Sequence, residues 1–173
     1  MVHFESTTVL PVDCATAFDL SLSIDAHVES FQGSGERAIG GVTSGVIGLG
    51  ESVRWQARHF GITWTMTSWI TEWDRPHRFV DEQQRGPFKS FRHEHVFRPI
   101  GEGTELRDVV DFAAPLGPLG RIAERVVLGR YLPHLIEVRN KFLVEEAEKV
   151  AAGAVAAPPV PAEPPAPPTV DDA

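Results

Sequence analysis

The chain has 173 residues and a formal net charge of −8, and 42% of its residues are hydrophobic. The acidic balance argues against a nucleic-acid-binding protein, because such proteins present a basic face to phosphates. No apolar run approaches the roughly 18 residues that a membrane-spanning helix needs. Cys14 is the only cysteine, which excludes an internal disulfide and a cysteine-based metal centre. Since the N-terminus shows no signal-peptide pattern, we expect a cytoplasmic protein.

The composition changes near Val150. Residues 151–173 hold seven of the 14 prolines and no leucine, isoleucine or aromatic residue. Such a segment cannot bury enough apolar surface to offset the entropy of ordering it. We therefore predict a domain over residues 1–150 and a disordered Ala/Pro-rich tail over 151–173. Whether the tail docks a protein partner stays open.

The N-terminal part predicts one strand followed by two short helices. Residues 3–10 mix β-branched and polar residues in loose alternation, and Pro11 ends this strand. Asp13 is placed to cap a helix that reaches Leu20, and a second short helix is expected at 25–31. A further strand is expected around residues 37–44.

The middle of the chain then switches to a period of two. Alternating residues predict strands at 53–59, 62–70, 79–85, 91–97 and 106–112, joined as an antiparallel meander. An amphipathic stripe follows at spacings of three and four, which predicts a long helix that Pro133 should kink or break. The stripe consists of Leu119, Ile122, Val126, Leu128, Tyr131, Leu135, Val138 and Phe142. The fold class expected is α+β, with a curved sheet of about seven strands around this helix.

Several segments carry a family resemblance across residues 2–149. They are PVDCATAFD at 11–19, RHFG at 58–61, DEQQRGPF at 81–88, FRHEHVF at 91–97 and DFAAPLG at 111–117. With them the chain resembles the SRPBCC superfamily, also called START-like or helix-grip proteins, in its polyketide cyclase/dehydrase-type branch. The resemblance implies an apolar cavity between the sheet and the long helix. Related cavities hold lipids, polyketides, quinones or hormones, and many members bind without catalysis.

His93 and His95 lie two residues apart on a predicted strand, on the face that also carries phenylalanines. If the aromatic face points inward, both imidazoles do as well. They could hydrogen-bond neighbouring polar groups or contact a ligand. They could also act as acid and base, because histidine titrates near neutrality.

Three polar residues on neighbouring strands are expected to face the same way. Asp81 and Gln83 share the inward face of one strand, and Asp108 shares that of another. A buried carboxylate needs a partner, and His93 and His95 are available. The group could orient a ligand or satisfy itself as part of the core. A metal shared by the histidines and a carboxylate is a further alternative, but we expect neither a metal nor a cofactor.

The leading functional hypothesis is non-catalytic binding of a hydrophobic small molecule, such as a lipid, polyketide, quinone or aromatic metabolite. The alternatives are a cyclase, aromatase or dehydratase that uses His93, His95, Asp81 or Asp108 as acid or base, and an interaction module. No nucleic acid and no membrane span are expected, and the protein partner, if there is one, stays unknown. The candidate ligand-binding residues are Trp55, His59, Trp64, Met66, Asp81, Gln83, Phe91, His93, His95, Asp108, Val110, Tyr131 and Leu135.

Overall fold

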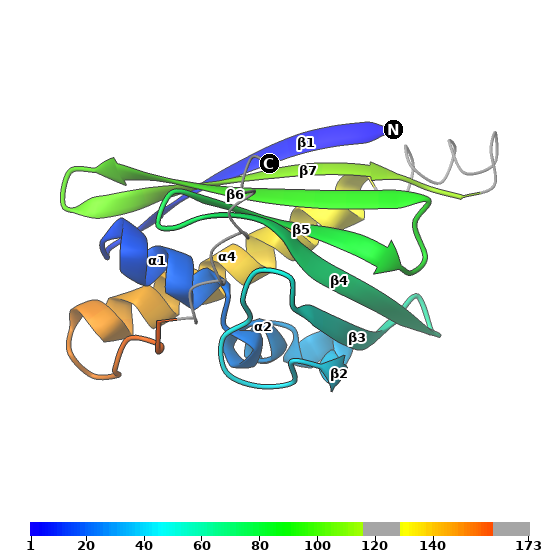
Figure 1. Ribbon diagram of the computed structural model, residues 1–173, viewed down its shortest axis with the longest axis horizontal. Coiled ribbons are helices and arrows are strands. Elements are labelled where there is room, and N and C mark those ends of the chain that lie inside the picture. Colours follow the sequence, from blue (N-terminus) through cyan, green and yellow to red (C-terminus); the bar gives the residue numbers. More distant parts are fainter. Residues whose placement is uncertain (116–128, 161–173) are drawn as a thin grey trace, which may run out of the picture.

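The computed structural model describes residues 1–115 and 129–160, and it consists of one antiparallel sheet with helices on one side (Figure 1). The strand order is β1-β7-β6-β5-β4-β3-β2, so the first strand pairs with the last and the others form a meander. This confirms the α+β helix-grip class. The elements are β1 (Val2–Leu10), α1 (Cys14–Ser21), α2 (Ile24–Ser30), η1 (Gln32–Ser34), β2 (Arg37–Gly41), β3 (Ser52–His59), β4 (Ile62–Asp74), β5 (Arg78–Arg85), β6 (Ser90–Ile100), β7 (Gly103–Ala113) and α4 (Gly129–Ala151).

The long helix α4 runs along the sheet with α1 and α2 beside it (Figure 1). Its inward stripe holds apolar residues such as Leu143 and Ala147, but also two polar ones, Arg139 and Asn140. At one end the apolar core is centred on Phe18 of α1, whose ring lies 5.3 Å from that of Phe79 and 5.4 Å from that of Phe97. This core closes one end of the space between sheet and helix.

Capping fixes the position of the short helices. The Asp13 carboxylate accepts hydrogen bonds from the backbone N–H groups of Ala15 (2.9 Å) and Thr16 (3.0 Å), as the sequence indicated. Ser23 caps α2 by accepting from the N–H of Ala26 at 3.1 Å. Both short helices contact α4.

Two details differ from the sequence-based expectation. The fourth strand extends to Asp74, because bulges after Thr67 and Ile70 let it bend and keep pairing with β5. Pro133 does not break the helix, since α4 runs through it. The bond lost there is the one to the carbonyl of Gly129, at the beginning of the described part of α4.

Some predictions fall on residues that the structure does not describe. The stripe residues Leu119, Ile122, Val126 and Leu128 lie outside the described residues, as does segment 161–173 of the predicted tail. No described helix is both long and apolar enough to cross a membrane.

Candidate functional site

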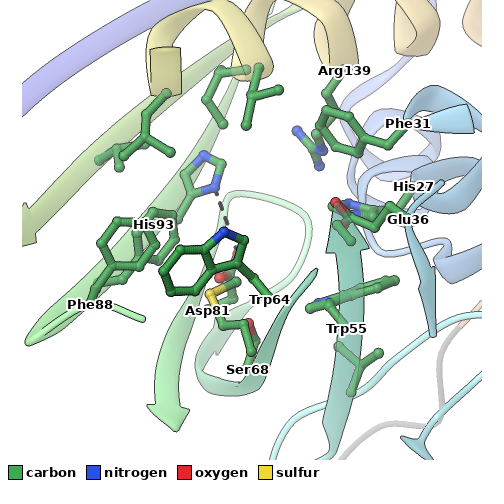
Figure 2. Close-up of a pocket in the computed structure, with 18 of the residues that line it drawn as sticks. His27, Phe31, Glu36, Trp55, Trp64, Ser68, Asp81, Phe88, His93 and Arg139 are labelled. Atoms are coloured by element: carbon green, nitrogen blue, oxygen red, sulfur yellow. Dashed lines mark hydrogen bonds and ion pairs between the residues drawn. The ribbon is translucent and has the colours of Figure 1, made fainter. Parts of the chain in front are cut away.

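A cavity of about 510 Å³ lies between the inner face of the sheet and helices α2 and α4. Its walls are mainly apolar and aromatic, with a few polar groups at defined places. In Figure 2, Arg139 points into the cavity from α4, while His93 points into it from the sheet. Of the residues predicted from sequence, the lining includes Trp55, His59, Trp64, Met66, Asp81, Phe91, His93, His95, Val110, Tyr131 and Leu135.

The two histidines of β6 are held side by side on the cavity wall. His93 is 5% exposed and His95 2%, and their ring centroids lie 3.8 Å apart. Phe79 of β5 stacks on His95 at 4.1 Å between centroids. The period of two along β6 places both imidazoles on the inward face, as the alternation predicted. Their orientation is therefore set by strand geometry and by packing.

Asp108 of β7 lies behind both histidines and is fully buried. Its Oδ1 lies 2.8 Å from Nε2 of His93, within a hydrogen bond, and 3.0 Å from Nδ1 of His95. That second contact is too far out of line for a hydrogen bond, and among the described residues Nδ1 of His95 has no hydrogen-bond partner. Oδ2 of Asp108 accepts a 2.6 Å hydrogen bond from the amide of Asn140. The carboxylate thus joins β6 and β7 to α4.

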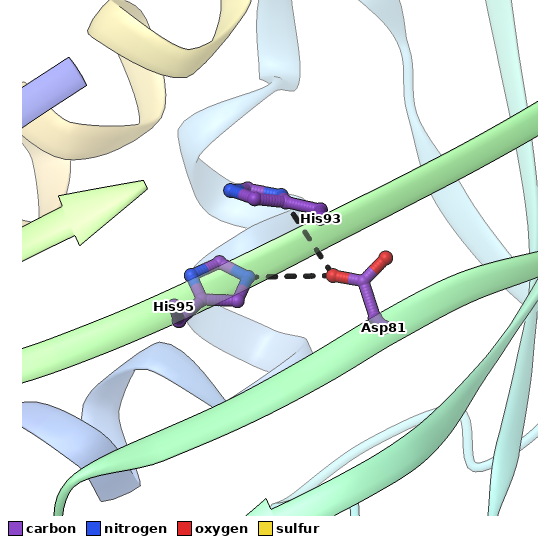
Figure 3. A group of neighbouring side chains, drawn as sticks. All are labelled: Asp81, His93 and His95. Atoms are coloured by element: carbon purple, nitrogen blue, oxygen red, sulfur yellow. Dashed lines mark hydrogen bonds and ion pairs between the residues drawn. The ribbon is translucent and has the colours of Figure 1, made fainter. Parts of the chain in front are cut away.

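Asp81 of β5 lies on the other side of the two rings. Its Oδ2 is 3.3 Å from Nε2 of His95 and 3.8 Å from Nδ1 of His93 (Figure 3). Asp81 pairs directly with His93 across the β5–β6 ladder, so their side chains leave the sheet together. Its side chain is 22% exposed and lines the cavity. Each imidazole therefore stands between two carboxylates, Asp81 facing the cavity and Asp108 behind.

Arg139 adds a buried cation to this group. It is 5% exposed, and its Nη1 lies 3.7 Å from Oδ1 of Asp108. The same guanidinium donates to the side chain of Asn140 at 3.3 Å and to the backbone carbonyl of Ser21 at 3.1 Å. Arg139 thereby balances the charge of Asp108 and ties α4 to α1.

The environment sets the protonation of the cluster. Burial opposes ionisation of Asp108, but the hydrogen bond with His93 and the charges of His93 and His95 outweigh it and hold its pKa well below the ordinary value. The pKa of Asp81 is also lowered, because the hydrogen bond from His95 and the charge of His93 overcome burial. Burial, followed by the nearby His95, lowers the pKa of His93. At neutral pH both carboxylates are charged and the His93 ring is neutral.

Two predicted residues do not line the cavity. Asp108 is buried behind the histidines and reaches the cavity only through them. Gln83 is turned toward the β5–β6 turn, where its amide donates to the carbonyl of Phe88 (2.8 Å) and accepts from the N–H of Phe88 (3.2 Å). Gln83 therefore holds in place a turn whose Phe88 lines the cavity.

Two further polar pairs occupy other parts of the wall. His27 of α2 contacts Glu36 at 2.6 Å and stacks on Trp55, with 4.2 Å between ring centroids. His59, at the end of β3, hydrogen-bonds the Tyr131 hydroxyl at 2.7 Å. Burial and then the charge of Glu36 raise the pKa of Tyr131, so this hydroxyl stays protonated at neutral pH.

Sequence reasoning missed several wall residues. Arg139 continues the inward stripe of α4 at the spacing of Ile136 and Leu143, and that spacing could have identified it. Ser68 alternates with Trp64 and Met66 along β4, so the period of two could have identified it as well. His27 and Glu36 carried no such signal, because their inward direction depends on how α2 and the segment after it pack.

The comparisons with known proteins identify the family and the fold of this chain. The family model described as "Polyketide cyclase / dehydrase and lipid transport" matches residues 1–148, so the chain belongs to this family. The chain is similar in structure to the protein TTHA0849 from Thermus thermophilus, with a TM-score of 0.69, 17% identity, and coverage of 89% of this chain and 100% of the other. A comparison with curated protein sequences finds no match.

Two other solved structures have the same fold. The Zhui aromatase/cyclase from Streptomyces sp. R1128 is similar with a TM-score of 0.68 and 18% identity, covering 88% of this chain and 97% of that one. A START superfamily protein from Mycobacterium smegmatis is similar with a TM-score of 0.62 and 15% identity, covering 86% and 98%. At these identities the likeness concerns the fold.

Proposed function

We propose that this domain binds a hydrophobic small molecule, such as a lipid, polyketide, quinone or aromatic metabolite, in the cavity between the sheet and α4. The observation that carries the proposal is a largely apolar cavity of about 510 Å³ with a compact polar cluster in one wall. Small-molecule sites are typically of this size, apolar with a few placed polar groups. Family membership supports the same class of ligand.

Apolar and polar residues contribute different surfaces to the cavity wall. Trp55, Met66 and Val110 contribute apolar surface, while Asp81, His93 and Arg139 contribute polar atoms. A ligand with an apolar body and one polar edge fits this division, since each buried polar group then has a partner. We propose ligand contact for all the sequence-predicted residues that line the cavity, and supporting roles for Gln83 and Asp108.

Filling the cavity tests the proposal directly. Ala57 is 7% exposed and lines the cavity from β3, so Ala57→Phe adds volume inside it. The matched control is Thr63→Phe, at an exposed position on β4 that does not line the cavity. Nile red, a neutral apolar fluorophore, should bind the wild type and Thr63→Phe saturably. We expect Ala57→Phe to weaken that binding at least tenfold, and equal binding by all three proteins would refute the proposal.

Acid/base catalysis is a second candidate, favoured by one specific observation. Asp81 and His93 face the cavity, and a second carboxylate, Asp108, holds His93 from behind. A histidine oriented by a carboxylate is a common general base, and such a pair could serve a cyclase, aromatase or dehydratase. Incubation with a poly-β-ketone thioester tests this by mass spectrometry. Water loss, or a new isomer of the same mass separated by chromatography, supports catalysis if it disappears in Asp81→Asn, and recovery of the unchanged substrate argues against it.

The proposal also covers the bounds of the domain, the C-terminal tail and the location of the protein. We propose that residues 1–150 form the binding domain, that 151–173 form a tail with no part in the core, and that the protein works in the cytoplasm. The acidic charge and the single cysteine support this setting. The partner proposed is the small molecule itself.

A further inference from the structure

We propose that Asp81, His93 and His95 form a binding site for a divalent first-row transition-metal ion, open to the cavity. This departs from the expectation drawn from the sequence, which favoured no metal. The proposal concerns the bare protein and does not depend on an organic ligand being bound.

The three side chains converge on one point. One ligand atom from each, the Asp81 oxygen and a ring nitrogen of each histidine, lies within 4.8 Å of the other two. The Asp81 Oδ2 is 3.3 Å from Nε2 of His95 and 3.8 Å from Nδ1 of His93. Atoms bound to one metal at about 2.0–2.2 Å lie about 3–3.5 Å from each other. Small side-chain movements would therefore bring all three donor atoms within bonding distance of one metal ion.

The positions of the donors are fixed by the sheet. His93 and His95 are alternate residues of β6, and Asp81 is the cross-strand partner of His93 on β5. Both strands lie in the interior of the sheet, each paired on both sides. The donors thus stand on rigid elements, and their approach requires no loop to close.

Asp108 orients both rings from behind. Metal-bound histidines usually donate their second ring N–H to a carboxylate or carbonyl. Nε2 of His93 bonds Asp108 at 2.8 Å, so Nδ1 of His93 is turned toward Asp81. Nδ1 of His95 lies 3.0 Å from the same oxygen and has no hydrogen-bond partner in the described part of the chain. A slight turn of the His95 ring toward a metal would let it donate there.

Charge and donor type indicate which ions fit. Arg139 lies 3.7 Å from Asp108 and offsets its charge, which leaves Asp81 as the net negative charge facing the cavity. Two imidazoles and one carboxylate suit Zn²⁺, Co²⁺, Fe²⁺ or Ni²⁺ better than Mg²⁺ or Ca²⁺, which prefer oxygen donors. Three protein ligands leave positions for an oxygen atom from the cavity, as in open metal sites.

Cobalt titration of the full-length protein tests the site. After treatment with a chelator and its removal, Co²⁺ should bind one to one with visible absorption bands, and Zn²⁺ should displace it. Asp81→Asn and His95→Gln should each weaken Co²⁺ binding at least tenfold. Asp108→Asn should weaken it by about 10–100-fold through the ring that it orients. The controls are His3→Gln and His134→Gln, because both histidines are exposed and neither lines the cavity.

The outcomes separate clearly. Absence of stoichiometric Co²⁺ binding by the wild type would overturn the proposal. Co²⁺ binding by Asp81→Asn and His95→Gln that is as tight as that of the wild type would also overturn it. Circular dichroism establishes that each variant is folded. If His95→Gln does not fold, Asp81→Asn decides, since it keeps the size of a partly exposed side chain. Loss of Nile red binding with intact Co²⁺ binding would count against the ligand proposal alone.

Discussion

The Oδ1 atom of Asp108 lies 2.8 Å from Nε2 of His93, and both side chains are buried at the junction of β6, β7 and α4. The carboxylate also accepts from Asn140 of α4 at 2.6 Å. A buried ionised group needs such partners, because leaving it unpaired is costly. The contact therefore connects the stability of the fold to the orientation of the histidines in the cavity wall.

Replacement of Asp108 should destabilise the protein strongly. Asp108→Ala removes the acceptor of two buried donors and leaves Arg139 without its nearest carboxylate. We expect the free energy of unfolding, measured by urea denaturation, to fall by about 3–5 kcal/mol. Asp111→Ala is the control on the same strand. Its partner His3 is largely exposed, so a loss below about 1 kcal/mol is expected. Similar losses in both variants would contradict the role given to Asp108.

Substitution of the histidines should separate structural from binding roles. His93→Ala leaves the buried Asp108 short of one donor, so we expect a loss of about 1–3 kcal/mol in unfolding free energy. It also removes a cavity-facing nitrogen, so the affinity for a polar-edged ligand such as 1-naphthol should fall several-fold per folded molecule. His95→Ala should act in the same direction. Unchanged stability together with unchanged affinity in both variants would exclude the cluster from the site.

Acid should weaken a charge network on the outer face of the sheet. Hydrogen bonds from Arg78 and Arg92 to Glu94 outweigh burial and lower the pKa of Glu94 from its ordinary 4.5. A carboxyl whose pKa is lower in the folded state stabilises the protein above the unfolded-state pKa. That stability is lost as the pH falls through the folded-state pKa. The free energy of unfolding should therefore decrease below about pH 4.5.

Glu94→Gln isolates this contribution. The variant should be less stable by about 1 kcal/mol at pH 7, and its stability should fall less steeply than that of the wild type between about pH 5 and 3. Glu102→Gln, in the exposed β6–β7 turn, serves as the control and should follow the wild type. Parallel pH profiles for Glu94→Gln and the wild type would show that the network has no such role.

The tail should be dispensable for folding. Residues 152–157 are exposed, and the composition of 151–173 cannot form a packed core. A chain that ends at Val150 should therefore unfold at the same midpoint as the full chain, within a few degrees, in a thermal melt. A larger drop would mean that the tail packs on the domain.

The sequence was informative about the fold because periodicity is a local property. The alternation along β6 showed that His93 and His95 share a face, and Asp13 indicated the first helix through its cap. Strand pairing is not local. That Asp81 stands opposite His93 follows from the register of β5 against β6, which the turn between them sets.

The details of the site depended on such non-local packing. Alternation placed Gln83 inward, but its amide turns to hold the backbone of Phe88. Asp108 is inward as expected, yet the imidazoles come between it and the cavity. Arg139 was overlooked because charged residues usually lie on the solvated side of a helix. Its burial needs Asp108, which only the assembled fold places within reach.

The central claim is that the cavity between the sheet and α4 holds an apolar small molecule. Native mass spectrometry of the protein purified from the cells that produce it, followed by extraction and identification of any bound compound, tests this most directly. We predict a one-to-one complex with an apolar molecule, reduced in Ala57→Phe and retained in Thr63→Phe. A wild-type protein that carries no such molecule and shows no saturable Nile red binding would contradict the account.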